Sequence, residues 1–119
     1  MTPLAYIKAR IEKPKTIKKI DSTMAELGDN SKRMSRLIAN AKAIRTEAEV
    51  EGVIDLAKEI RFLSDDCITR LARCRQCLKE NEFVAAGRFS EVAYGQAKEI
   101  EKKSKLLNVF TQNIRTRED

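Results

Sequence analysis

The sequence contains no histidine and no tryptophan, and only 2 prolines and 4 glycines occur among its 119 residues. The absence of histidine removes the side chain that most often carries general acid–base catalysis near neutral pH. Few glycines and prolines mean few tight turns, which a protein built from many short strands requires. These absences disfavour both an enzyme and a β-sheet fold.

Long apolar runs and a disulfide framework are also missing. No segment approaches the roughly 20 apolar residues of a membrane-spanning helix, and the N-terminus lacks the uninterrupted apolar stretch of a secretory signal. The three cysteines, Cys67, Cys74 and Cys77, are an odd number and lie within one expected helix. This usage fits a reducing compartment better than a set of disulfides. We therefore expect a soluble cytoplasmic protein with free thiols and no membrane partner.

Charged residues are abundant and unevenly distributed. They make up 35% of the chain, hydrophobic residues make up 42%, and the net charge is +6. Residues 1–20 contain six Lys/Arg against one Glu, whereas residues 46–66 contain two against seven Asp/Glu. Residues 67–88 return to five Lys/Arg against two Glu. The basic excess is therefore concentrated near the N-terminus, and an acidic segment precedes a basic one in the middle of the chain.

The apolar positions of residues 46–80 recur at alternating spacings of three and four, which places them on one side of an α-helix. This central stripe consists of Val50, Val53, Ala57, Ile60, Ser64, Cys67, Leu71, Cys74 and Leu78. Further apolar residues flank the stripe and make it wider than the seam of a two-stranded coiled coil. We therefore predict a core helix that contacts two partner helices at once, with Leu71 buried.

Two further segments have the same period. Residues 14–44 carry Ile17, Ile20, Met24, Leu27, Met34, Ile38 and Ala41, and residues 82–115 carry Ala86, Phe89, Ala93, Ala97, Ile100, Leu107, Phe110 and Ile114. Gly28 interrupts the first series without shifting its register, which favours one bent helix; the alternative is a break at Gly28 and four helices. The sequence predicts an all-α, antiparallel up-down-up three-helix bundle over residues 14–117.

Two short turns are expected to connect these helices. The first is expected at residues 45–47, because Thr46 and Glu49 have the spacing of a capping box. The second follows Glu80, where Asn81 is the expected N-cap of the last helix. Short connections between helices of similar length favour antiparallel packing.

The first residues form a separate basic segment. Pro14 is expected to end any helix or strand that precedes it and to begin the first bundle helix. Proline lacks an N–H, and in the first turn of a helix that N–H would have no acceptor within the helix. Residues 1–13 are then a basic N-terminal arm or a short helix capped by Thr2. The candidate binding residues of this region are Lys8, Arg10, Lys13, Lys15, Lys18 and Lys19. Their possible targets are nucleic-acid phosphates or an acidic protein surface, and the alternative is ordinary solubility charge.

No catalytic or metal-binding pattern is found. Cys74 and Cys77 form a C-x-x-C step, but a structural zinc site takes four ligands, and the chain has neither histidine nor a fourth cysteine. Asp65 and Asp66 are adjacent carboxylates, and adjacent helical residues point in different directions. We therefore predict no enzymatic activity, no cofactor and no metal.

Phe62 and Arg73 are the candidate contact residues of the central helix. If Val50 is position a of a heptad, Phe62 occupies position f, directly away from the core. The first hypothesis is a non-enzymatic helical interaction module, such as an adaptor, inhibitor or accessory subunit, that binds a protein partner or forms a homodimer through charged and apolar helix faces. The alternative is a nucleic-acid-associated helical protein that contacts the phosphate backbone through its basic arm.

Overall fold

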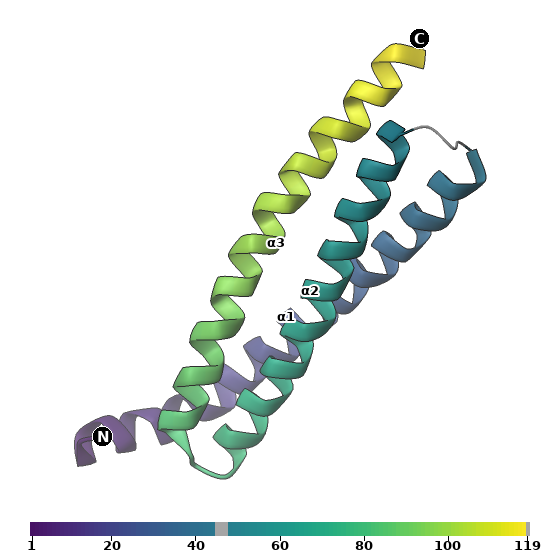
Figure 1. The fold of residues 1–119 in the computed structure, drawn as a ribbon. Coiled ribbons are helices and arrows are strands. Elements are labelled where there is room, and N and C mark those ends of the chain that lie inside the picture. The colour runs from purple at the N-terminus through teal and green to yellow at the C-terminus, as the bar shows by residue number, and fades with distance from the viewer. Residues whose placement is uncertain (45–47, 119) are drawn as a thin grey trace.

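Three α-helices make up the protein in the computed structural model, which describes residues 1–44 and 48–118. They are α1 (Pro3–Ile44), α2 (Ala48–Lys79) and α3 (Phe83–Glu118), and no strand occurs among the described residues. Figure 1 shows the chain running up, down and up. The rod that it forms measures 62 × 19 × 18 Å. The predicted all-α three-helix bundle is confirmed. The turn predicted at 45–47, with Thr46 as its cap, lies outside the described residues.

The core lies on both sides of α2, which packs along α1 and along α3, while α1 and α3 have few direct contacts. Every residue of the central stripe is buried, and Ile60, Ser64 and Cys67 are almost completely inaccessible. The buried residues that face them are Ile20, Leu27, Met34 and Ile38 from α1 and Phe83, Ala86, Ala93, Ile100 and Leu107 from α3. Leu71 is only 8% exposed, as expected from its place on the stripe.

The apolar series predicted for α3 is correct except at two described positions. Ala97 is exposed because Gln96, not Ala97, turns towards α2, where its amide nitrogen donates a hydrogen bond to Asp66. Phe110 is 39% exposed. The C-terminal end of α3 extends beyond the N-terminal end of α2 (Figure 1). The side chain of Ile114 is not among those described.

Helix α1 runs through both Pro14 and Gly28 without a break, so the predicted helix boundary at Pro14 is wrong and the four-helix alternative is excluded. A proline inside a helix removes one hydrogen bond, here the one to the carbonyl of Arg10. Both Pro14 and Arg10 are exposed, so water can satisfy that carbonyl. The first turns of α1 are bent relative to the rest (Figure 1), as expected for a helix that contains a proline.

The N-terminal end of α1 is helical from Pro3 and is attached to the bundle. Thr2 caps it as expected, because its Oγ1 accepts a hydrogen bond from the N–H of Ala5 at 3.2 Å. The ring of Tyr6 contacts Phe83 edge to face, with 5.2 Å between centroids. Tyr6 therefore attaches the N-terminal part of α1 to the start of α3.

The α2–α3 turn is a Schellman motif, and the prediction that Asn81 is an N-cap is wrong. The N–H of Glu82 donates to the carbonyl of Cys77 at 2.8 Å, and the N–H of Asn81 donates to that of Leu78 at 3.1 Å. Asn81 has φ 60°, which asparagine tolerates better than most residues other than glycine. Asn81 thus ends α2, and the carbonyl of Glu82 accepts the first hydrogen bond of α3, from the N–H of Ala86.

Candidate functional site

An open groove of about 580 Å³ lies between α1 and α3; we call it the α1–α3 groove. Its floor consists of Cys67, Leu71, Cys74 and Leu78 of α2, and its walls include Ala9, Thr16, Lys19 and Thr23 of α1 and Gly87, Ser90, Tyr94 and Ala97 of α3. The groove exists because α1 and α3 each pack on α2 and have few contacts with each other. Mostly small side chains on the α3 wall leave it open. This arrangement can accept the ridge of another helix.

The net positive charge of the protein is carried by α1. This helix contains ten Lys/Arg and four Asp/Glu, an excess of six, which equals the net charge of the whole chain. Exposed basic side chains on one side of it form what we call the basic face: Lys8, Lys15, Lys18, Lys32, Arg33 and Arg36. Exposed apolar side chains, Leu4, Ile7 and Ile11, share the N-terminal part of that side.

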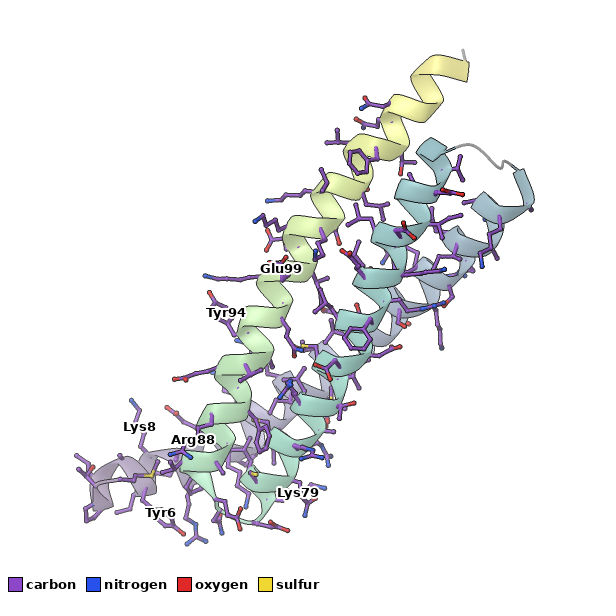
Figure 2. The ribbon with its side chains drawn as sticks, in the orientation of Figure 1. Tyr6, Lys8, Lys79, Arg88, Tyr94 and Glu99 are labelled. Carbon is purple, nitrogen blue, oxygen red and sulfur yellow. The ribbon has the colours of Figure 1, made fainter. Side chains whose placement is uncertain are left out.

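The six basic residues predicted as binding residues do not all have the same environment. Lys8, Arg10, Lys15, Lys18 and Lys19 are exposed, and the structure gives their side chains no hydrogen bond or ion pair within the described residues. Figure 2 shows Lys8 and Tyr6 at the same end of the molecule as Lys79 and Arg88. Their binding roles remain predictions.

Lys13 differs from the others because it is partly buried and has partners in the chain. Its Nζ donates to Oδ1 of Asn81 at 3.1 Å and lies 3.4 Å from the carbonyl of Lys79. A lysine at this point is favourable, because the C-terminal end of a helix carries partial negative charge. Lys13 therefore stabilises the end of α2.

Phe62 and Arg73 are both exposed on α2, and the exposure of Phe62 agrees with its predicted heptad position. Phe62 is 70% exposed. It borders a shallow hollow of about 400 Å³ that is also lined by Lys58, Glu59, Leu63 and Lys103. Arg73 has no hydrogen bond or ion pair within the described residues. Whether either residue contacts a partner stays a prediction.

The adjacent carboxylates are directed to different helices. Asp65 accepts a hydrogen bond from Oγ of Ser31 in α1 at 2.7 Å. Asp66 accepts hydrogen bonds from Gln96 of α3 and from Nε of Arg70, the latter at 3.3 Å. The two carboxylates therefore tie α2 to its neighbours and do not converge on a common point.

The cysteines line the contact between α2 and α3. The Sγ atom of Cys67 lies 3.5 Å from the carbonyl oxygen of Ala93, and that of Cys74 lies 3.3 Å from that of Ala86. Burial is the main cause that raises the pKa of both thiols, since desolvation disfavours the thiolate. Cys77 is only partly buried. Within residues 1–44 and 48–118, no group of three or more His, Cys, Asp or Glu is arranged to hold a metal ion.

Alkylation of the native protein with iodoacetamide at pH 8 is expected to distinguish the thiols. Cys77 should react first, while Cys67 and Cys74 should react at least about tenfold more slowly, because burial blocks the reagent and also raises the pKa of both thiols. Mass spectrometry of peptides from timed samples measures the three rates. Cys77→Ser should remove the fast reaction, and urea should make the remaining thiols equally reactive. Equal rates in the native protein would contradict the burial of Cys67 and Cys74.

Two ion pairs that join helices have no signal in the sequence. Arg75 of α2 binds Asp21 of α1, with 2.7 Å between Nε and Oδ1. Lys103 of α3 binds Glu59 of α2 at 3.0 Å, and this hydrogen bond is the main cause that raises the pKa of Lys103. These partners are separated by 54 and 44 residues, so only the packing brings them together.

The described helices thus provide one apolar groove, one basic face and the exposed side of α2. None of these helices is long and apolar enough to cross a membrane. None of the family models, curated proteins or solved structures with which the chain was compared matches it.

Proposed function

We propose that this chain is a non-enzymatic helical interaction module that binds an amphipathic helix of another protein in the α1–α3 groove. The observation that carries this proposal is the open groove with a floor of α2 core residues, among them Leu71 and Leu78. A fourth helix in the groove would complete a four-helix arrangement around α2 and bury its own apolar side against the floor.

The charge of α1 favours an acidic partner helix. Glu12 and Lys19 are the charged residues that line the groove, and Lys15, one turn before Lys19 on the same helix, adds a further positive charge beside it. The opposite wall contributes uncharged side chains such as Ser90 and Tyr94. Acidic side chains on the partner would therefore lie next to α1, where they would mainly speed association and fix the orientation of the bound helix.

Blocking the groove tests this proposal. Ala97 lines the groove and is exposed, so Ala97→Trp should fill the space without disturbing the core. Ala72→Trp is the matched control, because Ala72 is also exposed and does not line the groove. Proteins retained from nuclease-treated lysate by the wild type should be lost with Ala97→Trp and kept with Ala72→Trp. Circular dichroism and a urea melt verify that both variants fold like the wild type.

Retention of the same proteins by Ala97→Trp would refute the groove as the binding site. Loss of every partner on nuclease treatment would favour a second candidate, binding to nucleic acid. The basic face of α1 supports that candidate, because six exposed basic residues on one side of a helix can follow a phosphate backbone. Its affinity would fall steeply with salt and would differ little between unrelated sequences.

A further inference from the structure

The side of α2 that faces neither α1 nor α3 is a self-complementary surface. We call its exposed residues the outer face; they include Glu51, Asp55, Lys58, Phe62, Thr69 and Arg73. We propose that a second copy of this chain docks on the outer face, with the two α2 helices antiparallel and the two Phe62 rings in contact at a two-fold axis. This surface is distinct from the α1–α3 groove, because Phe62 is half a helical turn away from Leu71 on the groove floor.

The order of charges along the outer face requires the antiparallel arrangement. Glu51 lies eleven residues before Phe62, and Arg73 lies eleven residues after it. A two-fold axis at Phe62 therefore brings Glu51 of each copy opposite Arg73 of the other, twice per dimer. In a parallel dimer, each Glu51 would face Glu51 and each Arg73 would face Arg73. Like charges directly opposite each other are unfavourable.

The positions closer to the axis agree with this pairing. Asp55 lies seven residues before Phe62, and Thr69 lies seven after it, so a carboxylate meets a hydroxyl group. Lys58 lies four residues before Phe62. The residue four after Phe62 is Asp66, whose carboxylate is directed to α3 by Gln96, so Lys58 meets no like charge at this position. Neither position therefore places like charges opposite each other in the antiparallel arrangement.

One like-charged pair, three residues on either side of Phe62, does not oppose the arrangement. Glu59 is directed to α3, where it binds Lys103 at 3.0 Å. Asp65 is directed to α1, where it accepts the hydrogen bond of Ser31. The two carboxylates are therefore directed to opposite sides of α2, and each has a partner within its own chain.

The position of Phe62 allows a long contact with an apolar centre. Phe62 lies close to the middle of α2 (Ala48–Lys79), so an axis there overlaps almost the whole length of both helices. The hollow beside Phe62 provides about 400 Å³ next to Leu63 and the chains of Lys58 and Lys103. It can receive the Phe62 ring of the other copy, as an isologous interface requires. A desolvated aromatic pair at the centre would supply much of the affinity.

Sedimentation equilibrium of the full chain at several concentrations tests the dimer. The wild type is expected to dimerise, and Phe62→Asp is expected to raise the dissociation constant at least about 100-fold, since it places two carboxylates at the axis. Circular dichroism should show unchanged helix content, because Phe62 is outside the core. A wild type that remains monomeric at about 100 μM would refute the proposal, as would a dimer that Phe62→Asp leaves intact.

Charge reversal tests the antiparallel order. Glu51→Arg and Arg73→Glu should each raise the dissociation constant about tenfold, because each creates two like-charged pairs per dimer. The double variant Glu51→Arg/Arg73→Glu should recover wild-type affinity, and so should an equimolar mixture of the two single variants. Within one chain the two residues are 22 positions apart, about 33 Å along a helix, so the recovery cannot arise inside a monomer.

Matched controls come from α3, where Arg88 and Glu91 are exposed and lie outside the outer face. Arg88→Glu and Glu91→Arg should leave the dissociation constant unchanged. If the single reversals at Glu51 and Arg73 have no effect, or if the double variant is as weak as the single variants, the antiparallel arrangement is refuted. Because Ala97→Trp acts at the groove, it should leave the dimer intact, so failure of the groove proposal and failure of the dimer can be distinguished.

Discussion

Replacing Ile60 by alanine is expected to lower the free energy of unfolding by about 2 to 5 kcal/mol. Ile60 is completely buried in the middle of α2. The substitution removes three carbon atoms from the core that α2 shares with α1 and α3. Because the helices are held together on both sides of α2, the cavity can collapse only partly. A urea denaturation curve followed by circular dichroism measures the change.

Two further substitutions provide comparisons for Ile60→Ala. Leu71→Ala is expected to fall in the same range, because Leu71 is only 8% exposed although it borders the groove. Leu4→Ala is the control, since Leu4 is 79% exposed and should change the stability by less than about 0.5 kcal/mol. Equal effects of Ile60→Ala and Leu4→Ala would show that the stripe on α2 is not the core.

The core of α2 was predictable because one physical rule decides it. Apolar side chains at spacings of three and four can leave water together only on one side of a helix. In agreement with this rule, the whole central stripe is buried in the structure, including the polar Ser64. Ser64 is tolerated because its hydroxyl donates to the carbonyl of Ile60 at 2.8 Å and lies 3.3 Å from the amide nitrogen of Asn30.

The helix boundaries were less predictable because the same residue suits more than one position. Pro14 can begin a helix or bend one, and the outcome depends on whether the carbonyl of Arg10 reaches water. Asn81 can cap the start of a helix or adopt a positive φ at the end of one. The two Schellman hydrogen bonds and the amino group of Lys13 select the second role. None of these partners is visible as a sequence pattern.

Some features of the candidate surfaces could be predicted from the sequence, and others could not. The exposure of Phe62 follows from its heptad position, and the excess charge of α1 follows from counting residues. The α1–α3 groove could not be predicted, because it depends on how far apart two helices lie on a third. The sequence contains one weak signal for it, the small residues Gly87, Ser90 and Ala97 on one side of α3. Small residues also suit close helix packing, so this signal alone does not indicate a groove.

Replacing Ala93 by leucine is expected to destabilise the protein by about 1 to 3 kcal/mol. Ala93 is almost fully buried, and its carbonyl oxygen lies 3.5 Å from Sγ of Cys67. The backbone of α3 is therefore so close to α2 that a larger side chain must push the helices apart. Since α3 packs mainly on α2, displacement at this point weakens its principal attachment.

Ala97, one helical turn after Ala93, provides the control for this prediction. Ala97 belongs to the same apolar series in the sequence, but it is exposed at the wall of the groove. Ala97→Leu should therefore change the free energy of unfolding by less than about 0.5 kcal/mol, as for other exposed sites. Urea denaturation of the two variants compares them directly. If both leucines were tolerated equally, α3 would not be packed against α2 through Ala93; if both were equally destabilising, Ala97 would lie in the core and the groove would be closed.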